Sequence, residues 1–552
     1  MALARTFRDS LPDPSQEMTA VSPPAADPPS QKKRFLVNVV WSWIGVAVNL
    51  LLGIVLSPII VRRLGVERYG VWVLLFSTMD YLRLLDFGFR SAVINRCARY
   101  KARQEWTEVN QTVASAVVYF MMISTPCFLL AVLGRYAAMD FFKIQPTLQN
   151  DARLLILIIA VSISERLIVS PITGALEAFQ RFDLINRAYI VALMARAAGS
   201  ITLLLSGYGL IGLAVLTVCV QIGEDLWNIV NLKRVFPELK LSPQQVRVEA
   251  LKGMFQYGKH SSVMAAANLI SIQSPSTMLG YLRGPNDVAF FALPWRLLMY
   301  TAEAFAKVGY ITASVTAEFD EKRDSRNVWN MAVVTNRHCL ALFMPLAVFL
   351  SFYGTPLLTV WVSPLFGRTS GPLLPVLAAP FLFAIAGQFN SGAVLLGQGR
   401  HALYAYGIVV EVISSIAAMF LVVPRYGAFG AACVVAVSLM VSRCVYLAVI
   451  MCRINRFSIY EYIDAIYTRA LLCAVPVIMV AGLLRFRLLP GRTWFEVIGA
   501  GAILASLYFS LAFFAVLDPA SRSLILMRVP GSERVLEMWA RWDRRPSAVR
   551  RA

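Results

Sequence analysis

The feature that most constrains this chain is a series of apolar runs, each close to 20 residues long, that begins near residue 35 and ends near residue 517. A run of this length matches the helix needed to cross the hydrocarbon core of a bilayer. Hydrophobic residues make up 58% of the chain and charged residues 15%, against about 25% in soluble domains, so a soluble enzyme is excluded. The unbroken runs also exclude an outer-membrane barrel, whose strands alternate apolar and polar residues.

The runs predict an all-α, polytopic membrane protein with about fourteen transmembrane helices. The predicted spans are 35–61, 70–89, 112–133, 152–174, 184–205, 208–230, 256–282, 287–315, 329–352, 372–397, 402–423, 426–451, 466–485 and 494–517. The first 34 residues are rich in Pro, Ser, Ala and Asp, which is typical of a disordered tail. The predicted parts are a disordered cytoplasmic tail (1–34), an N-lobe with spans one to six (35–230), a cytoplasmic linker (231–255), a C-lobe with spans seven to twelve (256–454), the extra spans thirteen and fourteen (455–517) and a basic cytoplasmic tail (518–552).

The connections between spans differ in their content of Lys and Arg. Lys32, Lys33 and Arg34 precede span one, the even-numbered connections are rich in both residues, and the odd-numbered connections are poorer. This pattern predicts an even number of spans with both termini in the cytoplasm. The departures are Arg62, Arg63 and Arg68 after span one, and Arg485, Arg487 and Arg492 after span thirteen.

The two halves of the chain resemble each other at a nearly constant offset. Gly65 matches Gly284 at an offset of 219, and Gly209 matches Gly427 at an offset of 218. Six spans per half with the same starting side make a parallel repeat, with a pseudo-twofold axis along the membrane normal. Such a repeat is typical of transporters that work by alternating access, with the substrate site between the two halves.

Charged residues inside the spans indicate where a polar substrate would bind, because an ionisable side chain in hydrocarbon normally faces protein or water. In span eight, Arg296, Glu303 and Lys307 share one helix face at i, i+7 and i+11, and in span four Arg166 lies on a similar polar face. Cations exceed acids in this set, so the predicted cavity suits an anion such as a phosphate. The predicted substrate-binding residues are Arg296, Lys307, Arg166, Arg196 and Arg337.

A second set of charges predicts coupling or gating. Asp80, Arg83 and Asp86 form a ladder at i, i+3 and i+6 in span two, and Glu303 and Glu411 could carry a coupling proton. The alternative is that these charges pair with each other and lock helices together, an interpretation favoured for the ladder. Arg187, Lys259 and Arg443 are expected to snorkel to the cytoplasmic interface instead.

The sequence contains no motif for metal binding, cofactor binding or ATP hydrolysis. The eight cysteines form no CxxC pair and the three histidines are scattered, so neither a metal site nor a cofactor is predicted. The longest connection has no room for a nucleotide-binding domain, and GxxxxGK[ST] does not occur. The net charge of +20 is attributed to the positive-inside rule, and no nucleic-acid partner is predicted.

Two stretches carry a family resemblance: Leu64–Trp72 with Tyr81–Gly88 in the first half, and Gly284–Ala292 in the second half. They resemble the signature of bacterial polysaccharide exporters, including O-antigen flippases, within the multidrug/oligosaccharidyl-lipid/polysaccharide exporter superfamily. The resemblance implies two six-helix lobes around a central cavity and a substrate made of an oligosaccharide joined by pyrophosphate to a polyprenyl lipid. Spans thirteen and fourteen resemble the extra pair that forms a lipid-tail groove in the peptidoglycan-precursor branch.

Residues and resemblance together predict a non-enzymatic flippase of the bacterial inner membrane. It would move lipid-linked oligosaccharide from the cytoplasmic to the periplasmic leaflet during surface polysaccharide biosynthesis. Its expected partners are the anionic lipid-linked oligosaccharide and membrane lipids, with a polysaccharide polymerase or glycosyltransferases as candidates. Three alternatives stay open: an ion-coupled multidrug extruder of the same superfamily, a membrane-embedded glycan polymerase or ligase, and a scaffold without transport activity.

Overall fold

The computed structural model describes residues 29–517 and residue 522. Side chains are described throughout this part except at 29–40, 42, 43, 243, 257–261, 304, 307, 308, 310, 311, 385, 386, 388, 389 and 401. The predicted C-terminal tail and most of the predicted N-terminal tail lie outside the described residues. Helices, turns and loops make up the described chain, in which no strand occurs. The prediction of an all-α protein is confirmed.

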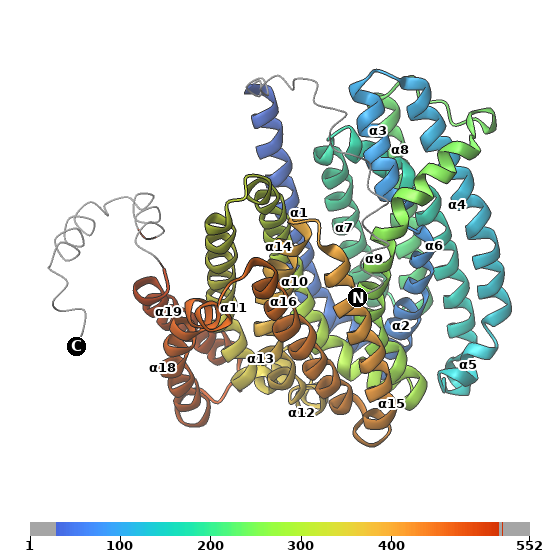
Figure 1. Ribbon diagram of the computed structural model, residues 1–552. Coiled ribbons are helices and arrows are strands. Elements are labelled where there is room, and N and C mark those ends of the chain that lie inside the picture. The colour runs from blue at the N-terminus through green and yellow to red at the C-terminus, as the bar shows by residue number, and fades with distance from the viewer. Residues whose placement is uncertain (1–28, 518–521, 523–552) are drawn as a thin grey trace.

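The first half of the chain forms one lobe, on the right in Figure 1. Within it α6 packs against α4, α3 and α8, while α7 packs against α8 and α1. Its elements are α1 (Pro29–Leu64), α2 (Val66–Met79), the 3-10 helix η2 (Asp80–Asp86), α3 (Phe89–Ala102), α4 (Trp106–Gly134), α5 (Ala137–Phe141), α6 (Gln149–Ala178), α7 (Phe182–Leu205) and α8 (Leu210–Val235).

The second half forms a lobe in which α11 and α15 pack on α13, and α15 packs on α9. Its elements are α9 (Val248–Arg283), α10 (Pro285–Glu321), α11 (Ser325–Trp361), α12 (Pro364–Ser370), α13 (Leu373–Ala386), the π-helix η5 (Gly387–Ser391), α14 (Gly392–Gly397), α15 (His401–Leu439), the π-helix η6 (Met440–Tyr446) and α16 (Leu447–Asn455). The remaining elements are α17 (Ile459–Ile463), the π-helices η7 (Asp464–Thr468) and η8 (Leu484–Leu488), α18 (Arg469–Leu483) and α19 (Trp494–Ala515). Helices α18 and α19 pack against each other and against α11, on the side of the C-lobe away from the N-lobe (Figure 1).

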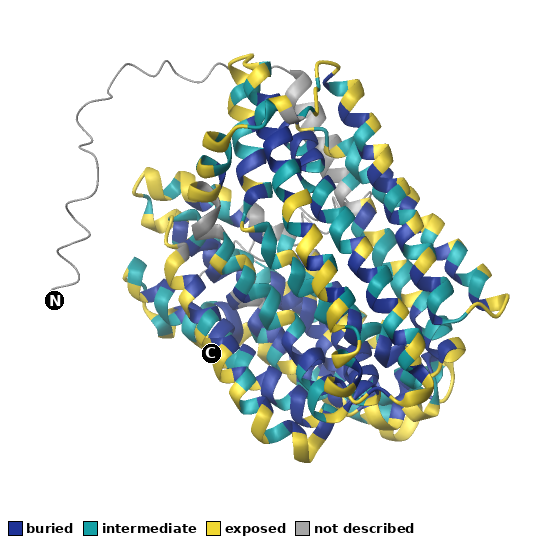
Figure 2. Ribbon diagram, turned by 90° about the vertical axis from the view of Figure 1, so that its right-hand side faces the viewer, coloured by how far each residue is buried: buried dark blue, intermediate teal, exposed yellow. Residues whose placement is uncertain are grey.

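Long apolar helices dominate the described part of the chain, where nine helical runs are long and apolar enough to cross a membrane. One of these runs, residues 402–455, contains two helices, because Gly427 has non-helical dihedral angles (φ 54°, ψ −136°) that kink α15. Many large apolar residues are exposed on the surface of the described part. Buried residues run along the interior of both lobes (Figure 2). The count of fourteen spans stays a prediction.

The parallel repeat is visible in the backbone. Gly65 precedes α2 with φ of 82°, and its predicted counterpart Gly284 precedes α10 with φ of 91°. Both conformations lie in the region that glycine adopts without the penalty of a Cβ atom. The matched glycines therefore make the same turn at the same place in each lobe.

Two predicted segments differ in detail from the elements that the structure shows. Span two is not one α-helix: α2 ends at Met79, η2 follows, and left-handed Phe87 (φ 43°) and Gly88 (φ 72°) separate η2 from α3. The linker predicted at 231–255 includes the last turn of α8, which ends at Val235, and the first turns of α9, which begins at Val248. Apolar runs locate the membrane core, whereas helices continue past it.

Helix α9 connects the two lobes. Its first turns pack on the N-lobe, where Met254 is part of the buried core and Arg96 Nη1 of α3 donates to the Ala250 carbonyl at 2.7 Å. Its later turns pack on α15 of the C-lobe. Helix α2 packs on α10 and on α9, so the lobes also meet directly.

Candidate functional site

Arg296 lies on α10, a helix near the centre of the molecule (Figure 1). Its side chain retains solvent-exposed surface. Its Nε donates to the Tyr300 hydroxyl at 2.9 Å, and its guanidinium carbon lies 5.7 Å from the centroid of the same ring. Tyr69 of α2 and Glu303 are the other ionisable groups that act on it. Because α10 is packed by α2, α9, α11, α13 and α14, we interpret this exposed surface as facing a space between helices rather than lipid.

Glu303 lies two turns further along α10 and is also exposed. Its Oε2 accepts a hydrogen bond from Asn49 Nδ2 of α1 at 3.2 Å, and Tyr189 of α7 lies within its electrostatic range. Arg296 and Glu303 therefore stand at the junction of α10 with α1, α2 and α7. The side chain of Lys307 lies outside the described residues.

Arg166 and Arg196 meet a group of buried polar residues inside the N-lobe. Arg166 lies 3.8 Å from both Glu224 and Asp225 of α8, and Arg196 of α7 lies in the field of Glu224 and Arg166. We call this set the α8 acidic group; its members are Gln221, Glu224, Asp225 and Asn228, all buried on α8, together with the half-buried Glu165 of α6. Two arginines thus face three carboxyl groups, so the cationic excess that the sequence suggested at these two residues is absent from this part of the lobe.

The α8 acidic group was missed by the sequence analysis. Gln221, Glu224, Asp225 and Asn228 are all buried, with 1–8% exposure, and recur at intervals of three and four residues on one face of α8. That spacing is the signal that could have found them, because i+3 and i+4 neighbours share a helix face. The cations of spans four and five thus have their acidic partners on span six.

The predicted ladder of Asp80, Arg83 and Asp86 lies in η2 at the contact between the lobes. Arg83 Nη1 is 3.8 Å from Asp80 Oδ1, and Gln273 of α9 donates to Asp80 Oδ2 at 2.8 Å. Asp86 Oδ1 accepts from the Arg90 amide at 3.2 Å, where α3 begins. The ladder therefore includes a hydrogen bond between the lobes and a link to the first turn of a helix.

Glu411 and Arg443 form a buried ion pair in the C-lobe. Arg443 Nε donates to Glu411 Oε2 at 2.5 Å, both side chains are 3% exposed, and Ser271 of α9 donates to Glu411 Oε1 at 2.6 Å. The expectation that Arg443 snorkels to the interface is wrong. Its guanidinium finds a carboxylate on α15, a helix that the sequence alone does not place beside it.

The remaining predicted cations lie elsewhere. Arg337 is half-buried on α11, the helix that packs against α18 and α19 on the far side of the C-lobe from α6. Arg187 is exposed on α7 and stacks over the Trp41 ring at 5.1 Å. The side chain of Lys259 is not among those described, so its predicted snorkelling stays a prediction. The structure brings Arg296 and Glu303 together, and Arg166 with Arg196, whereas Arg337 lies on a separate helix.

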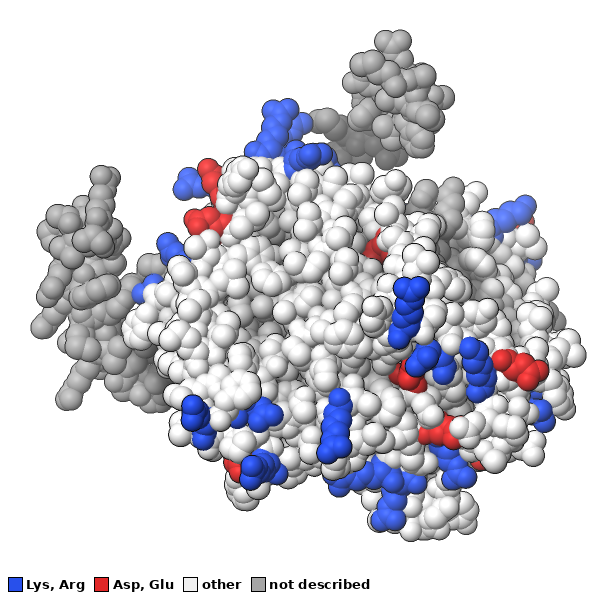
Figure 3. All heavy atoms as spheres, turned by 90° about the horizontal axis from the view of Figure 1, so that it is seen from below, with Lys and Arg blue, Asp and Glu red and all other residues white. Residues whose placement is uncertain are grey.

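One end of the molecule, which carries α5 and α12, joins the lobes through basic side chains. Arg62 at the end of α1 donates to the carbonyls of Val362, Trp361 and Val360 at 2.6, 3.0 and 3.2 Å. Lys143 Nζ donates to the Leu282 carbonyl at 2.8 Å. Seen from this end, Lys and Arg side chains are scattered over a largely uncharged surface (Figure 3).

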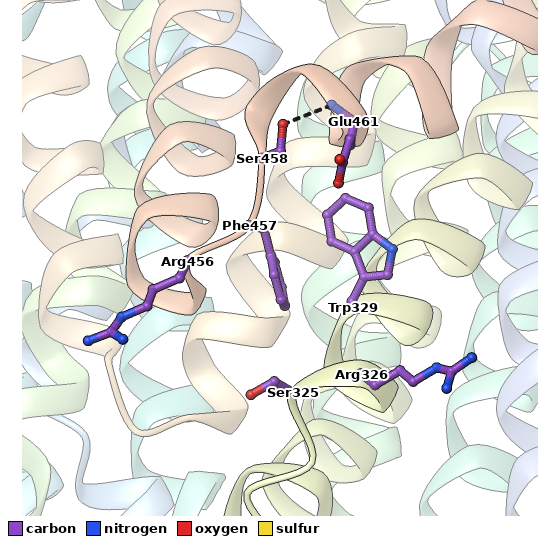
Figure 4. A pocket seen from close by; sticks show the side chains of 7 residues that line it. All are labelled: Ser325, Arg326, Trp329, Arg456, Phe457, Ser458 and Glu461. Carbon is purple, nitrogen blue, oxygen red and sulfur yellow. Dashed lines mark hydrogen bonds between the residues drawn. The ribbon is translucent and has the colours of Figure 1, made fainter.

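A pocket of about 280 Å³ lies where α11 begins and α16 runs into α17. Trp329 and Phe457 meet edge to face in it, with ring centroids 4.9 Å apart. Arg326 and Arg456 extend away from the rings in opposite directions (Figure 4). It is smaller than most ligand pockets, which measure about 300–1,000 Å³. The lining residues are Ser325, Arg326, Trp329, Arg456, Phe457, Ser458 and Glu461.

The described part of the chain contains no group of three or more His, Cys, Asp or Glu residues able to hold a metal ion. All eight cysteines are free thiols, and five of them are buried.

Comparison with known proteins finds one matching family and related membrane proteins. Residues 35–304 match the model of a family described as polysaccharide biosynthesis protein. A candidate O-antigen transporter of Shigella flexneri is 23% identical over 407 residues, covering 72% of this chain and 92% of that protein. An uncharacterised membrane protein of Bacillus subtilis, EpsK, is 22% identical over 504 residues, covering 90% of this chain and 98% of that protein.

Solved structures share the fold. The lipid II flippase MurJ in an inward closed conformation aligns with a TM-score of 0.65 and 13% identity, covering 87% of this chain and 99% of MurJ. A multidrug resistance MATE family transporter in an inward-facing conformation aligns with a TM-score of 0.64 and 14% identity, covering 77% and 98%. At these identities the likeness establishes the arrangement of helices and nothing about the substrate.

Proposed function

Because this chain belongs to the polysaccharide exporter family of the multidrug/oligosaccharidyl-lipid/polysaccharide exporter superfamily, we propose that it flips a lipid-linked oligosaccharide across the bacterial inner membrane. The substrate is an oligosaccharide on a polyprenyl pyrophosphate, taken from the cytoplasmic leaflet and delivered to the periplasmic leaflet. Both termini are cytoplasmic in this proposal, which places the α5 and α12 end in the periplasm. No chemical bond changes during the step.

The observation that carries the proposal is the position of Arg296. Its exposed guanidinium stands among Tyr69, Tyr300 and Glu303 at the junction of the two lobes. Arginine binds phosphate oxygens bidentately. Tyr69 and Tyr300 are buried, with 3% and 6% exposure, and the Tyr300 hydroxyl holds the guanidinium in place. The pyrophosphate would bind Arg296, the glycan would cross between the lobes and the prenyl chain would remain in lipid.

Movement would follow alternating access of the two lobes. In the proposed orientation the α5 and α12 end would face the periplasm, and the contacts of Arg62 and Lys143 that join the lobes there support a state closed on that side. Energy would come from an ion gradient or from the membrane potential, which supplies about 2.3 kcal/mol per elementary charge per 100 mV.

The test replaces Arg296 in a strain whose chromosomal copy of the gene is deleted. Surface polysaccharide and the lipid-linked precursor accessible from the periplasm are measured for each variant. Arg296→Glu should abolish export, Arg296→Lys should retain part of it, and Arg296→Ala should lower it at least about tenfold, because a charge-assisted hydrogen bond contributes about 1.5–3 kcal/mol. Arg187→Glu is the matched control, since Arg187 stacks on Trp41 at 5.1 Å and belongs to no predicted site. Full export by Arg296→Glu would contradict the proposal.

A second candidate is ion-coupled extrusion of drugs, which the fold likeness to MATE transporters favours. The charge at the lobe junction distinguishes the two functions, because a cationic drug would need Glu303, whereas an anionic pyrophosphate needs Arg296. Drug susceptibility of the deletion strain, with and without Glu303→Gln, decides this alternative. Unchanged susceptibility in all strains is the result that we expect.

A further inference from the structure

Asp225 is the most deeply buried carboxyl group in the described part of the N-lobe, with 1% of its surface exposed. Neither of its carboxylate oxygens receives a hydrogen bond from a described donor. The nearest cation, Arg166, is 3.8 Å away, and its own side chain is 43% exposed. An ionised carboxylate at such a site costs several kcal/mol of free energy unless hydrogen bonds or close charges compensate it.

A second carboxyl group supplies a partner for a proton. Glu165 of α6 is held by Gln221, whose Nε2 donates to Glu165 Oε2 at 2.7 Å, and its carboxyl group interacts with that of Asp225. Two adjacent carboxylates resist simultaneous ionisation, and a proton shared between them removes the repulsion. It also provides the hydrogen-bond donor that Asp225 lacks.

The charged groups on the helices that surround Asp225 leave an excess of one negative charge, which fits one bound proton. Helix α6 contributes Glu165 and Arg166, α7 contributes Arg196 and the neutral phenol Tyr189, and α8 contributes Glu224 and Asp225. Helix α2, which also touches α8, carries its only charged residues, Glu67 and Arg68, in its first turn. Two arginines against three carboxyl groups leave one negative charge, which a single proton neutralises.

A further buried polar atom near Asp225 lacks a hydrogen-bond partner among the described residues. Asn228 is 1% exposed, lies one turn after Asp225 on the same face of α8, and its Oδ1 has no hydrogen-bond partner among the described residues. An acceptor left unsatisfied beside a carboxyl group is a place for a proton donor. The partly exposed Arg166 side chain connects the group with solvent.

We propose that Asp225 and Glu165 form a proton-binding site in the N-lobe, with Arg166 as the cation that stabilises its deprotonated state. The proton is taken from water and is carried between the two carboxyl oxygens. Its use as the coupling step rests on the proposed transport function, whereas the binding of the proton does not.

The experiment measures the proton directly by infrared difference spectroscopy of the purified full-length protein in lipid nanodiscs. The wild-type chain should show a band of a protonated carboxyl group that titrates with pH and shifts in heavy water. Asp225→Asn should abolish this band, and Glu165→Gln should abolish or shift it. Glu177→Gln is the matched control on the same helix, since Glu177 accepts a hydrogen bond from Arg90 at 2.7 Å outside the site, and it should leave the band unchanged.

Three results would overturn the proposal. The first is a wild-type spectrum without such a band over the whole pH range in which the protein stays folded. The second is a band that survives in both Asp225→Asn and Glu165→Gln. The third is loss of the band when Na⁺ replaces K⁺ at constant pH, because a sodium ion would then occupy the site. Export by Asp225→Asn is measured separately, so a confirmed band with unchanged export removes the coupling role alone.

Discussion

Arg443 and Glu411 form the most completely buried ion pair among the described residues. Removing one partner leaves the other charge buried and unpaired, which costs about 3–5 kcal/mol. We therefore expect Arg443→Ala and Glu411→Ala each to lower the thermal unfolding midpoint strongly in detergent. Lys322→Ala is the control, because its pair with Glu318 is exposed and should leave the midpoint unchanged. Unchanged midpoints in the first two variants would show that the pair is dispensable.

A pattern contained within one helix can be predicted from the sequence. The shared face of Arg296 and Glu303 follows from their spacing of seven residues, and both residues are exposed in the structure, whereas their role in substrate binding stays a prediction. The partner of Arg443 could not be predicted, because Glu411 lies 32 positions away on a different helix. Asp225 was missed for a different reason: its spacing with Gln221 and Asn228 was present in the sequence, but a buried acid without partners becomes visible only in the packed lobe.

At the level of elements, the contact of α2 with α10 depends on a glycine. A Cβ atom at Gly70 would overlap the carbonyl group of Pro285, the first residue of α10. We expect Gly70→Ala to destabilise the protein by about 1–3 kcal/mol, measured as a lower unfolding midpoint, because overpacked cores cost that much. Gly223→Ala on α8 is the control with nothing within 4 Å, and it should stabilise by about 0.5–1 kcal/mol. Equal effects of both changes would contradict a close α2–α10 approach.

The end of α11 depends on a cation from the other lobe. Arg62 donates to three carbonyls of the last turn of α11, so it both satisfies orphan acceptors and complements the helix dipole. Arg62→Ala should speed amide hydrogen exchange in residues 355–362 about fivefold, corresponding to about 1 kcal/mol of local stability. Arg63→Ala, beside it and exposed, should leave the exchange unchanged. The same role explains why Arg62 departs from the positive-inside pattern.

The positions of the helices could be predicted from the apolar runs, whereas the breaks within the helices could not. The offset between Gly65 and Gly284 predicted the same turn in both lobes, because a left-handed glycine marks the backbone directly. The break after Asp86 was not predicted: the ladder's spacing fits an α-helix, and only the left-handed pair Phe87 and Gly88 interrupts it. A short irregular segment carries too few residues to leave a periodic signal.

At the level of the whole molecule, the sequence predicts two like lobes but not which end of them is closed. In the proposed alternating-access mechanism, hydrophobic patterning and the repeat would be the same in every state, because each lobe would keep its own core. The state is fixed instead by contacts between lobes, such as Lys143 with Leu282 and Asp80 with Gln273. These contacts join residues more than 130 positions apart, and nothing in either segment alone identifies its partner.

The last prediction tests whether the closed end must open. A Cβ atom built at Gly284 lies 3.9 Å from the Cβ of Lys143 in the other lobe, within the range of about 3.5–4.5 Å that a disulfide spans. Lys143→Cys with Gly284→Cys, in a background where the exposed Cys219 is Ser, should form a disulfide on mild oxidation. Export should then stop and should return on reduction.

Each single cysteine variant serves as the control for strain, since Lys143 (φ 52°) and Gly284 (φ 91°) both have left-handed backbone conformations. Oxidation should leave export by the single variants unchanged, because neither can bridge the lobes. If the oxidised double variant exports at the rate of its reduced form, the α5 and α12 end need not separate. Glycan would then have to leave by a lateral route between helices, and rocking of the two lobes would not be the transport step.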